Sequence, residues 1–217
     1  MAPSHRSVIR DDESVAIPGG RIDFKTPADA PARAATVTFH TGPDIPRTGL
    51  HWHEKHTEYL QVLQGCALIT VGDRTAVFTK DDGVVTVPRF TIHGFGRADD
   101  TEEGRGSRDI ELIMREWTDP ADGDKELFFR NILGLVKDWK KTLLGNIAMG
   151  ISALVVSSGH DSYPVFWNGP AMFGKGVQVA FMRASTYAVL GLADVVGWLG
   201  GFRAEYEEYT PRSMTRA

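Results

Sequence analysis

The segment from residue 35 to residue 114 consists of short β-prone runs that alternate with turn residues. Dipeptides such as Gln64-Gly65 and Gly72-Asp73 lie between the runs, and residues of this kind typically close hairpins between antiparallel strands. Short strands at this close spacing predict an antiparallel sandwich or barrel. The six predicted strands are 35–39, 59–63, 67–71, 75–79, 84–87 and 110–114.

The residue pattern changes near Asp119-Pro120. Beyond this point apolar residues recur at helical spacing over 128–139, and the stretches 142–159 and 177–202 are mostly apolar. The sequence therefore predicts a mainly β fold, a single barrel with a C-terminal helical extension. The expected division is a flexible N-terminal arm at residues 1–20, a barrel at 21–118 and the extension at 119–217.

The sequence does not decide what the helical extension packs against. Polar residues interrupt both apolar stretches, so neither matches a membrane span of about 20 apolar residues. We expect the extension to pack on the barrel or against a second subunit, which would make the protein a homodimer. Attachment to a membrane surface through these helices is the alternative.

Composition restricts the partners and the compartment. The chain has 217 residues, of which 42% are hydrophobic, and this is enough for a core. Its 24 basic and 28 acidic residues give a net charge of −4, so no nucleic-acid partner is expected. A single cysteine, Cys66, excludes an internal disulfide and an all-cysteine zinc site. The first residues lack the apolar segment of a secretory signal, so we expect a cytoplasmic protein.

Three histidines and a glutamate are spaced as a candidate metal site. His51 and His53 are two residues apart, so on a strand their side chains leave the same face. Glu58 opens the next β-prone run after a polar break, and His93 follows a predicted strand. This donor set suits Fe(II), Mn(II), Ni(II), Cu(II) or Zn(II) and leaves coordination positions for substrate. The neighbouring His56 is expected to be a solvated turn residue.

These residues resemble the two motifs of the cupin superfamily. The first motif has His-x-His, four residues, Glu, six residues and Gly, and the second ends in Pro followed five positions later by His. The matching residues are His51, His53, Glu58, Gly65, Pro88 and His93, and Phe90, Asp82 and Arg97 depart from the second motif. The resemblance covers residues 35–117 and implies a single cupin jelly-roll barrel with the metal in its mouth.

The layout as a whole also resembles fungal single-cupin proteins in which a helical extension follows the barrel. These are called cupin-domain-containing oxidoreductases and are often encoded with polyketide synthases. The resemblance implies oxygenase-type oxidation of a small organic molecule, aromatic or polyketide-derived, in secondary metabolism. His51, His53, Glu58 and His93 would then hold Fe(II) or Mn(II).

Two other functions remain open from the sequence. The same metal could act only as a Lewis acid in a cyclase, isomerase or lyase. Alternatively, the barrel could bind a small molecule without catalysis. No residue is assigned as a catalytic acid or base, and no cofactor other than the metal is expected.

Overall fold

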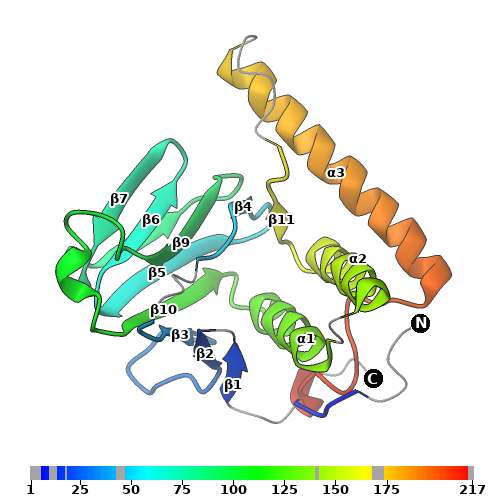
Figure 1. Ribbon diagram of the computed structural model, residues 1–217, viewed down its shortest axis with the longest axis horizontal. Helices are drawn as coiled ribbons and strands as arrows, with labels where there is room; N and C mark the ends of the chain where they lie inside the picture. Colours follow the sequence, from blue (N-terminus) through cyan, green and yellow to red (C-terminus); the bar gives the residue numbers. More distant parts are fainter. Residues whose placement is uncertain are drawn as a thin grey trace. The chain divides into compact units, whose positions relative to one another are not determined.

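A computed structural model describes residues 6–9, 14–17, 19–42, 47–139, 142–167 and 174–214 of the chain (Figure 1). The chain divides into two compact units. Asp12–Glu126 form the first, which we call the β unit. Met1–Asp11 and Leu127–Ala217 form the second, which we call the helical unit.

The β unit is built from two antiparallel sheets. One sheet has the strand order β1-β2-β3-β10-β5-β8, and in the other the strands of this unit follow the order β4-β9-β6-β7. The strands are β1 Ser14–Ile17, β2 Gly20–Asp23, β3 Ala35–Phe39, β4 His51–Trp52, β5 Thr57–Gln64, β6 Ala67–Val71, β7 Arg74–Phe78, β8 Val84–Val87, β9 His93–Arg97 and β10 Leu112–Asp119.

The core of the β unit follows from alternation along its strands. In β5 the side chains of Glu58, Leu60 and Val62 are buried while their neighbours are partly exposed, and β10 repeats this pattern. Successive side chains of a strand point to opposite faces, so each of these strands presents one apolar face to the interior. Trp52, Ile69 and Met114 complete the buried set with almost no exposed surface. The predicted barrel of antiparallel strands is confirmed.

The N-terminal part of the chain differs from the prediction. Residues 14–17, assigned above to a flexible arm, form β1 and pair with β2, whereas residues 1–5, 10–13 and 18 of that arm lie outside the described residues. The reason is that Val15 and Ile22 are register partners and are both buried in the core. Two strands of four residues each offer too short an alternation to be recognised in the sequence.

Gly65, which closes the turn between β5 and β6, has a backbone that alanine does not fit. Its φ is +79°, and an added Cβ would lie 2.8 Å from the backbone oxygen of Glu111. We expect Gly65→Ala to lower the free energy of unfolding by about 2–3 kcal/mol, because strain and steric overlap add. Urea denaturation would measure the loss.

Gly72 supplies a matched control for that substitution. It also has a positive φ, +60°, but an added Cβ would meet only the side chain of Thr91, at 3.9 Å. Gly72→Ala should therefore cost only the backbone strain, about 1 kcal/mol. Equal losses for the two variants would contradict the steric argument at Gly65.

The helical unit contains most of α1 (Asp124–Asp138), α2 (Leu143–Gly159), the short strand β11 (Tyr163–Pro164) and α3 (Lys175–Gly200). Helices α2 and α3 pack closely where an added Cβ on Gly197 would lie 2.6 Å from Val155. The C-terminal segment is tied to α1 because the backbone N–H of Tyr206 donates to the Asn131 Oδ1, at 2.8 Å. The predicted C-terminal helices are confirmed.

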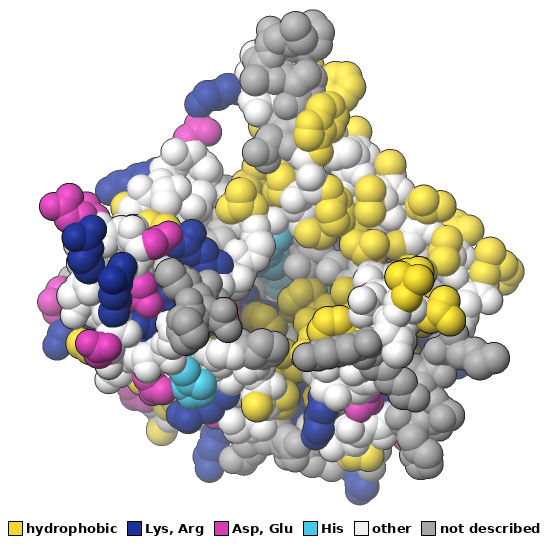
Figure 2. All heavy atoms as spheres, viewed as in Figure 1, with side chains coloured by type: hydrophobic (Ala, Val, Ile, Leu, Met, Phe, Trp, Pro, Cys, Tyr) yellow, Lys and Arg dark blue, Asp and Glu magenta, His cyan; other side chains and the backbone are white. Residues whose placement is uncertain are grey.

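Helix α3 is long and apolar enough to cross a membrane, judged by length and composition, and it is the one such helix in the described part of the chain. Apolar side chains gather along it in Figure 2. The most exposed large ones on this helix are Phe181, Tyr187, Leu192, Val195, Trp198 and Leu199. A second subunit or a membrane surface as the partner of this helix stays a prediction.

Candidate metal centre

Strand pairing places the histidines of the candidate site together. His51 on β4 and His93 on β9 are direct cross-strand partners, and His53 follows β4 by one residue. Trp52, between the two histidines, is fully buried. This is the alternation expected of a strand, so His51 and His53 leave one face while Trp52 leaves the other.

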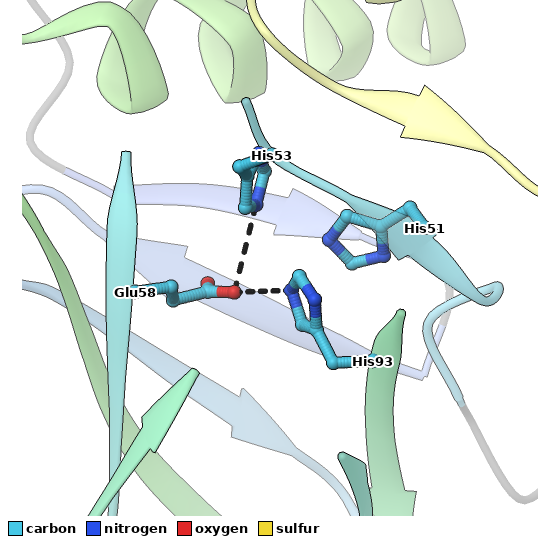
Figure 3. Close-up of side chains that lie close together, drawn as sticks. All are labelled: His51, His53, Glu58 and His93. Atoms are coloured by element: carbon cyan, nitrogen blue, oxygen red, sulfur yellow. Dashed lines mark ion pairs between the residues drawn. The ribbon is translucent and has the colours of Figure 1, made fainter. Parts of the chain in front are cut away.

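The fourth residue comes from the other sheet. Glu58 is the second residue of β5, and its side chain points toward His53 and His93, with His51 beside them (Figure 3). One nitrogen or oxygen from each of the four side chains lies within 4.8 Å of all the others. The Glu58 Oε2 is 3.5 Å from the His53 Nε2 and in close contact with the His93 Nε2. The structure thus brings together all four residues that the sequence singled out.

Two of the imidazole rings are oriented by backbone carbonyls. The Nδ1 of His51 lies 2.9 Å from the Gly49 oxygen, and the Nδ1 of His93 lies 3.0 Å from the Thr91 oxygen. A carbonyl oxygen can only accept, so each Nδ1 carries the proton and donates it. The Nε2 lone pair of each ring is then free to bind a metal, and this is how metal-binding histidines are commonly held.

Burial and charge keep these groups in the forms that bind metals. Burial and the neighbouring rings of His93 and His53 hold the pKa of His51 well below its usual value. Burial raises the pKa of the Glu58 carboxyl, but the positive charge of Lys125 and the contacts of the carboxylate with His93 and His53 outweigh this and hold that pKa well below its usual range. At neutral pH the cluster therefore offers a neutral imidazole and a carboxylate, the forms in which these side chains coordinate.

Two of the four candidate donor atoms lack a hydrogen-bond partner, as expected of atoms that bind a metal ion. The His93 Nε2 and the Glu58 Oε2 are buried and make no hydrogen bond of acceptable geometry. A buried polar atom left in this way costs free energy, and a cation at the meeting point of the four side chains would remove that cost. Three imidazole nitrogens and one carboxylate oxygen are ligands that divalent transition metals prefer.

The paired sheets and the two histidine-bearing segments decide the fold class. The β unit is a cupin-like barrel. No family model matches the chain. It is 27% identical over 163 residues to a curated protein of Hypocrea virens named "Probable oxidoreductase virH". That match covers 74% of this chain and 66% of the relative, which is just under two thirds of the relative's length.

Solved cupin structures resemble part of the chain. KdgF of Halomonas sp. is 21% identical, with a TM-score of 0.36 over 52% of this chain and 89% of its own. Oxalate decarboxylase of Lactobacillus farciminis is 26% identical, with a TM-score of 0.35; the match covers 48% of this chain and 29% of that protein. The Cnp3 cupin domain of Schizosaccharomyces pombe is 19% identical, with a TM-score of 0.33; the match covers 47% of this chain and 61% of that domain. Similarities of this size add nothing to the argument from the site itself.

Two charged residues beside the cupin-like site, the buried Glu116 and the partly buried Lys125, were not predicted from the sequence. Lys125, in the first turn of α1, contacts the Glu58 Oε1, and its Nζ lies 3.0 Å from the Glu116 Oε2 on β10. Burial and the Glu58 charge raise the pKa of Glu116 to about 7, against the attraction of Lys125. The alternation along β10 could have placed Glu116 inside the barrel, since Met114 and Thr118 on the same face are buried too.

Other residues near the site differ from expectation. His56 is buried, and its Nε2 lies 3.1 Å from the Asp122 Oδ2. The prediction that His56 is a solvated turn residue is therefore wrong. It lies outside the metal cluster because its ring is held by Asp122. Phe90, where the cupin motif has glycine, adopts a positive φ of 64°. The backbone shape that the motif glycine favours is thus kept with a phenylalanine.

Proposed function

We propose that this protein is a metal-dependent cupin oxidoreductase of the oxygenase type, with Fe(II) or Mn(II) bound by His51, His53, Glu58 and His93. The observation that carries the proposal is the convergence of these four donors within 4.8 Å. The name of the Hypocrea virens relative supports the reaction class. The further proposal of a small aromatic or polyketide-derived substrate in secondary metabolism rests on the resemblance of the layout to fungal cupin oxidoreductases.

The exposure of the four side chains indicates where substrate approaches. Glu58 and His93 are almost fully buried, whereas His51 is partly exposed and the side chain of His53 is 11% exposed. Substrate would therefore reach the site past His51 and His53, while Glu58 and His93 hold the inner side. A bound Fe(II) or Mn(II) ion would polarise a coordinated substrate and exchange electrons with it.

Charge balance gives the carboxylate a second role. Three neutral imidazoles leave the charge of a divalent ion uncompensated, and the Glu58 carboxylate removes half of it. The site would then keep a positive charge that favours an anionic or enolic oxygen of the substrate. Burial of Glu58 away from water strengthens this attraction.

The requirement for oxygen tests the proposal. A strain of the source organism that lacks the gene would accumulate the substrate, and its extract supplies the assay mixture for the purified Fe(II)-loaded protein. We expect the accumulated compound to be consumed in air and left unchanged under strict anaerobiosis. Equal consumption without oxygen would replace the oxygenase by a Lewis-acid cyclase, isomerase or lyase. The protein would instead be a non-catalytic binding protein if two results came together. The accumulated compound would not be consumed in air, and a strain carrying His51→Ala and His93→Ala would make as much final product as the wild type.

A further inference from the structure

The two oxygens of the Glu58 carboxylate face different partners. Oε2 is directed to the histidines, at 3.5 Å from the His53 Nε2 and in close contact with the His93 Nε2. Oε1 accepts a hydrogen bond from the Lys125 ammonium group. Since an oxygen held by an ammonium group is a poor metal ligand, only Oε2 is well placed to coordinate an ion.

Lys125 is in turn held by a second carboxylate. Its Nζ lies 3.0 Å from the Glu116 Oε2, and the side chains of both glutamates are 1% exposed. The register explains the proximity, because Thr118 on β10 is the cross-strand partner of Glu58 and Glu116 lies two residues along the same face. Glu116, Lys125 and Glu58 thus form a chain of side chains in contact that ends at the metal cluster.

The ammonium group is needed in this arrangement for an electrostatic reason. Two carboxylates buried near each other repel strongly, and the repulsion is little screened away from water. Lys125 lies against both and has a side chain only 14% exposed. Without it, the Glu58 carboxylate would lose the contact that fixes its rotation about the bond to its methylene carbon.

We propose that Lys125 is a positioning residue that presents Glu58 to the metal through Oε2 alone, and that Glu116 holds Lys125 in place. This inference rests on the metal site of the proposed function. Coordination through a single carboxylate oxygen leaves one more position on the ion for substrate than coordination through both oxygens does. Lys125 would therefore set the number of open positions as well as the affinity for metal.

The test measures Co(II) binding by purified full-length protein, through competition with a chelator and the visible absorption of the bound ion. Lys125→Met keeps the length of the side chain and removes its charge. We expect this variant to bind Co(II) about 10- to 100-fold more weakly, the usual cost of losing a partner of a metal ligand. Its absorption spectrum should also change, because freeing Oε1 alters the coordination of the ion. Lys137→Met, at an exposed position of the same helix, is the control and should match the wild type.

A double variant separates positioning from stability. Lys125→Met combined with Glu116→Leu removes the carboxylate that would be left without its ammonium partner, so thermal stability should recover. The Co(II) affinity should stay low, because Glu58 still lacks its hydrogen-bond donor. Recovery of wild-type affinity and spectrum in the double variant, or no loss in Lys125→Met, would overturn the inference. Failure of the wild type itself to bind Co(II) would instead overturn the proposed function and, with it, this inference.

Discussion

His93→Gln is expected to lower the affinity for a divalent transition metal by at least about 100-fold, because losing a ligand costs more than losing the partner of one. His93 is fully buried, and its Nε2 is in close contact with the Glu58 Oε2, so it lies at the centre of the cluster. Glutamine is close to histidine in volume and keeps the core filled. Competition with a chelator for Co(II) or Zn(II) measures the change, and circular dichroism checks the fold.

The control for His93→Gln is His40→Gln in the same unit. The His40 side chain is 44% exposed and lies 2.6 Å from Glu111, away from the cluster. This variant should bind metal as the wild type does. A His93→Gln protein that is folded and retains wild-type affinity would show that the four side chains do not act as one site.

Removing the metal is expected to lower the thermal unfolding midpoint by about 10 °C. A ligand that binds only the folded state stabilises it by about 2.7 kcal/mol when its free concentration is 100 times the Kd. For a unit of this size that corresponds to a shift of about 10 °C. Calorimetry of chelated protein, before and after addition of Mn(II) or Fe(II) under nitrogen, measures the difference.

The specificity of that stabilisation is part of the prediction. Mg²⁺ prefers an octahedron of oxygen ligands, so it should not restore the midpoint at a site with three imidazoles. Glu58→Gln should reduce the shift caused by Mn(II), because the variant has lost the charged ligand. Equal midpoints for chelated and reloaded wild-type protein would contradict a metal bound by the folded barrel.

The barrel strands and the four clustered residues could be predicted because their signals are local. The predicted runs 35–39, 67–71 and 84–87 coincide with β3, β6 and β8, whose alternation and turns lie within a few residues. The spacing of His51, His53 and Glu58 likewise depends on one strand and one bend. Only the position of His93 needed a pairing across the sheet, and the second motif supplied it.

The residues behind the site could not be predicted because they meet over long separations. Lys125 and Glu58 are 67 positions apart in the chain, and a lysine in the first turn of a helix usually faces solvent. His56 is buried by a contact with Asp122 that is 66 positions away. Such contacts depend on how the first turn of α1 and the preceding loop return to the barrel, and no periodicity in the sequence records this.

Elemental analysis of full-length protein purified without a histidine tag tests the central claim most directly, with Glu58→Ala analysed in parallel. The convergence of His51, His53, Glu58 and His93 predicts one divalent transition-metal ion per wild-type chain and a large loss of metal in the variant. Wild-type protein that is folded and active but contains only traces of metal, before and after incubation with Fe(II) or Mn(II), would contradict the account.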